Sequence, residues 1–140
     1  MTVIKITACV FISLGLFGCD NSEKTKENEE EKLTQTQDMI ISEAKKSLPY
    51  QVDLVTTLVD VFKDDNSINY RYSIKVSKNQ LHMSETEKLT TENLKNIYCT
   101  DNQQIKEFRD AFPNGAVHNY YINNEKIFSI KLTPDSCNVN

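Results

Sequence analysis

Ile68-Asn69-Tyr70-Arg71-Tyr72-Ser73-Ile74-Lys75-Val76-Ser77 is the stretch that decides the fold. Apolar or aromatic side chains alternate with polar ones along its whole length. Side chains two residues apart share one face of a strand. The sequence therefore predicts a strand over residues 68–77 with one buried face and one solvated face, and it places Arg71 on the solvated face.

The residues before this strand predict its hairpin partner. Residues 50–62 are rich in β-branched and apolar side chains on both faces, which indicates a strand covered on both sides or one with a bulge. Residues 63–67, Lys-Asp-Asp-Asn-Ser, have the chemistry of a turn. We expect the two strands to form a hairpin with a five-residue loop.

Three helices and a second hairpin complete the domain. Apolar residues recur at helical spacing over residues 33–48, and Pro49 ends that helix. A capping box at residues 84–87 begins a helix that ends at Cys99, and a shorter helix follows up to Phe112. Residues 116–122 and 127–132 are predicted strands on either side of an Asn-Asn-Glu-Lys turn.

The resulting order is α-β-β-α-α-β-β, which predicts the α+β class. Two hairpins with helices between them imply a four-stranded antiparallel sheet with helices on one face. We expect residues 33–140 to form this single domain, closed by one disulfide.

The chain opens with the features of an export signal. A basic residue, Lys5, precedes the apolar residues 6–17, which are too few to cross a bilayer because a spanning helix needs about 20. Leu16-Phe17-Gly18-Cys19 resembles the lipobox of bacterial lipoproteins. That resemblance implies removal of residues 1–18 and palmitate-type acylation of Cys19, whose acyl chains would hold the protein on a membrane. The alternative is an ordinary signal peptide in which Cys19 is incidental.

The residues after Cys19 predict which membrane holds the protein, and they predict a spacer between that membrane and the domain. Asp20 and Asn21 resemble the sorting signal that keeps lipoproteins at the inner membrane of enteric-type bacteria, which favours its periplasmic face over the outer membrane. Residues 20–32 contain no apolar side chain, so we expect 19–32 to be an acylated cysteine followed by a disordered, charged tether. An acidic recognition tail is the alternative.

The cysteines divide by position. Cys9 leaves with the signal, so Cys99 and Cys137 remain as a pair in an oxidising compartment, which indicates a disulfide. The alternative, a two-thiolate metal site, lacks a CxxC motif or a neighbouring histidine.

Charge and motifs argue against several function classes. Residues 19–140 hold 15 basic and 20 acidic residues, a net charge of −5 without a basic patch, which excludes nucleic-acid binding on charge grounds. Neither His82 nor His118 stands at metal-ligand spacing, and no nucleophile, metal or phosphate-loop motif occurs. We therefore predict no metal, no cofactor and no enzymatic activity.

The tyrosines offer a different kind of site. Tyr70 and Tyr72 share one strand face, whereas Tyr121 points to the face opposite Tyr120. Tyrosine is enriched at protein interfaces, so Tyr121 and Arg71 are candidates for a partner surface. The alternative is that most of the tyrosines fill the core.

A wider resemblance rests on Leu48–Asp53, Tyr70-x-Tyr72, Tyr98-Cys99-Thr100, Gly115, Tyr120-Tyr121 and Cys137. This pattern is similar to small, mostly uncharacterised bacterial lipoproteins and exported proteins, and it implies a disulfide-bonded α+β periplasmic domain without an assigned activity. The layout of anchor, helix, sheet and disulfide also resembles the α/β pilotins of type II secretion. Asp20 departs from that likeness, because pilotins work at the outer membrane.

These observations predict a membrane-anchored periplasmic lipoprotein that serves as a non-catalytic protein-binding or accessory module, with an envelope protein as its partner. The alternative is an inhibitor lipoprotein of the immunity or superinfection-exclusion type.

Overall fold

The computed structural model describes residues 21–138, with side chains from residue 25 onward. The predicted signal peptide, the acylated Cys19 and the sorting residue Asp20 lie outside the described residues, as does the side chain of Asn21. The elements follow the order α1 (Asn21–Lys46), β1 (Tyr50–Gln51), β2 (Thr56–Asp64), β3 (Ser67–Ile74), η1 (Lys78–Gln80), α2 (Met83–Tyr98), α3 (Gln103–Ala111), β4 (Ala116–Ile122), β5 (Glu125–Leu132) and η2 (Pro134–Cys137).

One five-stranded mixed sheet replaces the expected four-stranded antiparallel one. Its strands lie in chain order, β1-β2-β3-β4-β5, and β3 pairs with β4 in parallel while the other pairs are antiparallel. The α+β class and the two hairpins, β2–β3 and β4–β5, agree with the sequence. The prediction of four strands and of a wholly antiparallel sheet was wrong.

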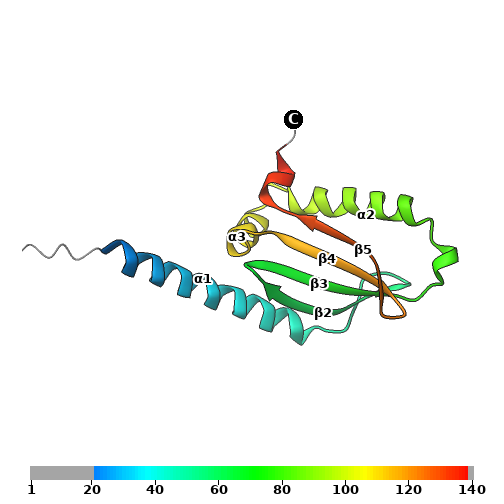
Figure 1. The fold of residues 1–140 in the computed structure, drawn as a ribbon, viewed down its shortest axis with the longest axis horizontal. Coiled ribbons are helices and arrows are strands. Elements are labelled where there is room, and N and C mark those ends of the chain that lie inside the picture. Colours follow the sequence, from blue (N-terminus) through cyan, green and yellow to red (C-terminus); the bar gives the residue numbers. More distant parts are fainter. Residues whose placement is uncertain (1–20, 139–140) are drawn as a thin grey trace, which may run out of the picture.

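The parallel pair follows from the length of α2. Its 16 residues span about 24 Å, close to the roughly 26 Å of an eight-residue strand. α2 carries the chain back along the sheet, and α3 turns it across the end (Figure 1). β4 consequently begins at the end of the sheet where β3 begins, which is the geometry of a crossover between parallel strands.

The fifth strand arises because the expected strand over residues 50–62 is broken. The Asp53 carboxylate oxygen Oδ1 accepts hydrogen bonds from the backbone N–H groups of Val55, at 2.8 Å, and Thr56, at 2.7 Å. This turn folds β1 back on β2, so that Tyr50 lies opposite Leu58. A short polar residue that binds its own backbone favours a turn over a continuous strand.

The hairpin turns are tighter than expected. The β2–β3 turn consists of Asp65 and Asn66, both at positive φ, rather than of five residues. Asn123 and Asn124 likewise form the β4–β5 turn at positive φ. Asparagine and aspartate tolerate this left-handed region, and two such residues make the turn that matches strand twist.

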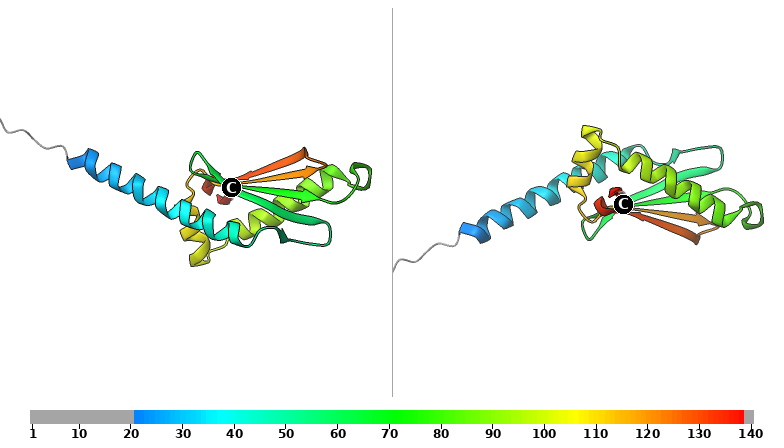
Figure 2. Two further views of the ribbon diagram at one scale, coloured as in Figure 1. Left: turned by 90° about the horizontal axis from the view of Figure 1, so that it is seen from below. Right: turned by 90° about the horizontal axis from the view of Figure 1, so that it is seen from above.

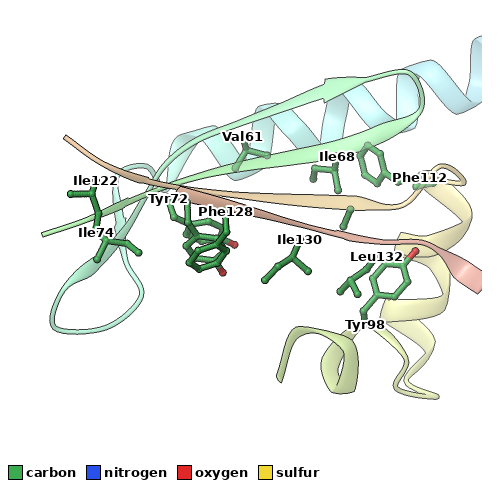
Figure 3. Packing of buried hydrophobic residues seen from close by; sticks show 13 residues of the cluster. Val61, Ile68, Tyr72, Ile74, Tyr98, Phe112, Ile122, Phe128, Ile130 and Leu132 are labelled. Atoms are coloured by element: carbon green, nitrogen blue, oxygen red, sulfur yellow. The ribbon is translucent and has the colours of Figure 1, made fainter. Parts of the chain in front are cut away.

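The helices lie on one side of the sheet (Figure 2). The core between them is built from alternate residues of β3, β4 and β5 together with Tyr98 at the end of α2 and Phe112 after α3 (Figure 3). The predicted period of two places Ile68, Tyr72 and Ile74 on that buried side, but β3 ends at Ile74 rather than at residue 77, and Asn69 on the face expected to be solvated is only 9% exposed.

α1 has two halves of different character. Residues 33–46 pack on the domain through Ile40, Ile41 and Ala44, whereas every side chain from 25 to 32 is exposed. The composition of residues 20–32 predicts a tether, but the helix extends back to Asn21 and projects from the domain (Figure 1). Glutamate and lysine favour helix, and the Gln35 amide donates to the Glu31 carboxylate at 3.2 Å, so a helix begun by packing continues into the charged segment.

A disulfide joins Cys99 to Cys137, as the sequence predicts, with the two Cα atoms 5.2 Å apart. It ties the end of α2 to η2, which follows β5. The Arg109 guanidinium of α3 donates to the carbonyl oxygens of Tyr98 and Thr100 at the same place. α2 is therefore fixed to the rest of the fold at its C-terminal end.

Candidate binding groove

A row of stacked rings runs across the middle of the sheet, on the side of the helices. We call these rings the aromatic floor: Tyr70, Tyr72, His118, Tyr120 and Phe128. Ring centroids are 4.8 Å apart between Tyr70 and His118, and 4.6 Å apart between Tyr72 and Tyr120 and between Tyr120 and Phe128. The register explains the row, because each of these pairs lies directly opposite on neighbouring strands.

Two adjoining hollows lie between the aromatic floor and α2, and together we call them the groove. One has a volume of about 200 Å³ and extends toward α3, and the other, of about 390 Å³, extends to the β1–β2 loop. Leu94 and Ile97 of α2 line both hollows. At the rim, Ile97 is 61% exposed and Val52 is 49% exposed, so apolar side chains face solvent at the opening.

The groove exists because α2 packs loosely over the sheet. Tyr98 is the one buried residue among its 16, and the others are half-buried or exposed. Toward the middle of the helix, Thr86 and Thr90 line the larger hollow, and their short polar side chains leave space above Tyr72 and Tyr120. A helix with a wide apolar face would fill this space, so the composition of α2 keeps the groove open.

The titratable groups of the floor are held neutral by burial. Burial lowers the pKa of His118 to about 4 and raises the pKa of Tyr70 to about 12. Burial also raises the pKa of Tyr72, and burial together with the charge of Asp53 raises that of Tyr120 to about 12. The Tyr72 hydroxyl lies 3.1 Å from His118 Nδ1, and it can donate a hydrogen bond to the neutral imidazole that carries its proton on Nε2. The floor is therefore an uncharged surface at neutral pH.

One residue at the edge of the groove is charged. Among the described residues that line the two hollows, Asp53 is the only carboxylate, and they include no lysine or arginine. Burial acts to raise the pKa of the Asp53 carboxyl, but hydrogen bonds from Val55 and Thr56 outweigh it and lower the pKa below its ordinary value. Asp53 thus places a negative charge at the β1–β2 end of an apolar groove.

The residues predicted as a partner surface lie on the opposite side of the sheet, which we call the open face. Arg71 on β3 and Tyr121 on β4 are brought together there, with the guanidinium carbon 4.0 Å from the centre of the tyrosine ring. The ammonium of Lys126 lies 5.8 Å from the same ring. The structure thus joins the two predicted residues, and their contact with a partner stays a prediction.

The other histidine, His82, is exposed and precedes α2. Within residues 21–138, no group of three or more histidine, cysteine, aspartate or glutamate side chains could hold a metal ion. No helix in this part of the chain is long and apolar enough to cross a membrane.

Sequence reasoning missed the groove. It needed the parallel pairing of β3 with β4, which alone sets Tyr70 beside His118 and Tyr72 beside Tyr120. One signal was available, because residues 52–55 carry apolar side chains around Asp53 in a segment that was interpreted as a strand.

Comparison with known proteins gives few relatives. No protein-family model matches this chain. It is 35% identical over 99 residues to Protein K of Escherichia coli, and the match covers 70% of this chain and 53% of Protein K. The chain therefore spans about half the length of that curated relative.

A solved structure has a similar fold. It is the crystal structure of a Pseudomonas aeruginosa protein predicted to be secreted, with a TM-score of 0.60 and 14% identity over 76% of this chain and 94% of that one. The similarity to small bacterial proteins supports the coarser part of the resemblance drawn from the sequence, and at this identity the solved structure shows the fold alone.

Proposed function

We propose that the chain is a lipid-anchored, extracytoplasmic accessory protein of the bacterial envelope, and that its folded domain binds another protein through the groove. The groove carries this proposal: it is concave, floored by aromatic rings, rimmed by exposed apolar side chains and edged by a single charge. Such sites bind ligands through apolar contact, with a few polar groups that fix orientation.

Three observations support the location. A disulfide such as Cys99–Cys137 persists in oxidising compartments. Residues 16–19 have the form of a lipobox, and Asp20 with Asn21 favours the periplasmic face of the inner membrane. The structural relative in Pseudomonas aeruginosa is itself predicted to be secreted. In this arrangement the projecting part of α1, residues 21–32, spans about 18 Å and acts as a spacer between Cys19 and the sheet.

The chemistry of the groove favours binding over catalysis. General acid–base catalysis works best with groups whose pKa lies near the working pH. Burial lowers the pKa of His118 to about 4 and raises that of Tyr70 to about 12, so neither group exchanges protons readily at neutral pH. A neutral aromatic surface instead suits apolar side chains of a partner.

The anchor is tested by Cys19→Ala in the full chain, with Cys9→Ala as the matched control. We expect Cys19→Ala to move the protein from the membrane fraction to the soluble periplasmic fraction, while Cys9→Ala stays on the membrane. Unchanged membrane recovery of Cys19→Ala would show that the anchor is wrong.

The binding surface is tested by placing a photo-cross-linking residue at one of two positions in living cells. A probe at Ile97 reports on the groove, and a probe at Tyr121 reports on the open face. We expect one specific envelope-protein adduct from Ile97, which disappears when Thr90→Trp fills the groove. An adduct from the probe at Tyr121 alone would show that the partner binds to the open face and not to the groove.

A further inference from the structure

The β1–β2 end of the groove combines exposed apolar side chains with one carboxylate. We call Val52, Asp53, Leu54 and Val55 the lip. Leu54 is 99% exposed and Val52 is 49% exposed, so exposed apolar side chains gather at this end of the groove, as they do at protein interaction sites. Asp53 is exposed between them, and it takes part in none of the five ion pairs of the described residues.

The position of the lip favours a protein over a membrane as its partner. The lip lies at the end of the sheet opposite the projecting end of α1 (Figure 1). If Cys19 is acylated, the lip points away from the anchoring membrane. An anionic lipid headgroup would also be repelled by the Asp53 carboxylate.

The lining of the groove indicates a peptide chain. Thr86, Thr90 and Asn93 of α2 face the larger hollow beside the aromatic floor. Their hydroxyl and amide groups can pair with the polar backbone of a peptide, whereas an acyl chain would leave them unsatisfied. Apolar side chains of the same peptide would rest on Tyr72, Tyr120 and Phe128, which line that hollow from below.

We propose that the groove takes a basic amphipathic protein segment, one in which lysine or arginine stands next to large apolar side chains. The apolar side chains contact the aromatic floor and the lip, and the basic group pairs with Asp53. Residues 33–140 hold 12 basic and 14 acidic residues, a net charge of −2, and the Asp53 carboxylate at the groove favours a basic segment over an acidic one. This inference rests on the proposed function and adds the chemistry of the partner.

The test uses four fluorescent peptides of equal length and the chain from residue 19 with Cys19→Ser. One peptide combines leucine and phenylalanine with lysine, the second replaces lysine with glutamate, the third replaces it with serine, and the fourth keeps lysine but replaces the apolar residues with serine. By fluorescence anisotropy, we expect the first peptide to bind at least about tenfold more tightly than the second or the fourth, with the third in between.

Asp53→Asn isolates the charge. Asparagine keeps a side-chain oxygen for the N–H groups of Val55 and Thr56, so the turn persists while the charge is lost. We expect about three- to fivefold weaker binding of the lysine peptide, as for a partly exposed ion pair, and unchanged binding of the serine peptide. Asp110→Asn makes the same charge change on the exposed side of α3, and we expect no effect on either peptide.

The outcomes separate this inference from the proposed function. If the lysine and serine apolar peptides bind equally and Asp53→Asn changes nothing, the basic partner is overturned while binding in the groove stands. If Thr90→Trp, with an unchanged circular dichroism spectrum, leaves every peptide bound as before, both fall. Failure of all four peptides to bind, or tighter binding of the unacylated chain to phosphatidylglycerol vesicles than to any peptide, overturns the basic segment as occupant.

Discussion

The two faces of the central strands β3 and β4 differ in their contacts, although their side chains alternate along the same strands. On the covered face, Tyr70, Tyr72, His118 and Tyr120 stack on one another and on the core. On the open face, polar side chains bond to one another, as where the Ser129 hydroxyl donates to the amide oxygen of the buried Asn119 at 3.0 Å. The covered face therefore holds the apolar core and the groove, whereas the open face is held by polar contacts such as those of the buried Asn119.

The largest loss of unfolding free energy is expected where the apolar core meets the end of α3 (Figure 3). Phe112 is fully buried, so Phe112→Ala removes a large apolar side chain and leaves a cavity. We expect the free energy of unfolding to fall by about 4 kcal/mol. Urea denaturation measures this, with Tyr121→Ala on the open face as the control. Equal losses for the two variants would contradict the contrast between the faces.

Removing the disulfide is expected to cost slightly less and to act mainly on α2. The double substitution of Cys99 and Cys137 by alanine opens a loop with a sequence separation of 38, which costs about 3 to 4 kcal/mol in the chain-entropy model. Tyr98, at the C-terminal end that the disulfide holds, is the buried residue of α2. We therefore expect the amide protons of α2 to lose their protection from hydrogen exchange before those of β3 and β4. An unchanged melting temperature under reducing conditions would contradict this.

The sequence predicted what depends on local pattern and missed what depends on distant contact. The period of two over residues 68–77 identified the buried face of β3, and an even pair of cysteines in a chain predicted to be exported identified the disulfide. The direction of β4 could not be deduced from its own residues, because it is set by how far α2 carries the chain along the sheet. The residues of the groove depend on that direction, so they were missed together.

Gln37 is a second case in which the local sequence pattern does not reveal contacts with distant segments. Its polar side chain predicts an exposed position on α1, yet it is 1% exposed, because its amide nitrogen donates to the Ala111 carbonyl at 2.8 Å and to Asn66 Oδ1 at 3.1 Å. Both acceptors come from segments far along the chain. Helical periodicity alone cannot reveal such partners.

The third prediction concerns pH and the covered face. The pKa of His118 is about 4 in the fold, below its ordinary value of 6.5, because burial disfavours the imidazolium. The pKa of His118 is lower in the folded state than in the unfolded state. Its contribution to the free energy of unfolding is therefore fully present above pH 6.5 and is lost as the pH falls toward 4, by about 3 kcal/mol in all. His118→Gln, which can still accept from Tyr72, should flatten the profile of unfolding free energy between pH 6.5 and 4. A profile that keeps its slope would locate the effect elsewhere.

Gln37 supplies the fourth prediction. Gln37→Ala leaves the buried Ala111 carbonyl without its side-chain donor, and we expect a loss of about 2 kcal/mol. Gln35→Ala is the matched control two residues away, where an exposed hydrogen bond to Glu31 is lost at about 0.5 kcal/mol or less. Similar losses from both variants would mean that burial does not decide the cost.

The smallest loss of unfolding free energy is expected on the open face. Arg71→Ala removes the guanidinium that lies 4.0 Å from the centre of the Tyr121 ring, a half-buried cation–π contact worth about 1 kcal/mol. A double-mutant cycle with Tyr121→Leu measures this coupling by urea denaturation. A coupling well above that value would give the open face a share of the stability assigned to the covered face. A small coupling accompanied by loss of the envelope-protein adduct would instead identify Arg71 and Tyr121 as the partner surface that the sequence predicts, because a residue that costs the fold little yet abolishes binding acts on the partner.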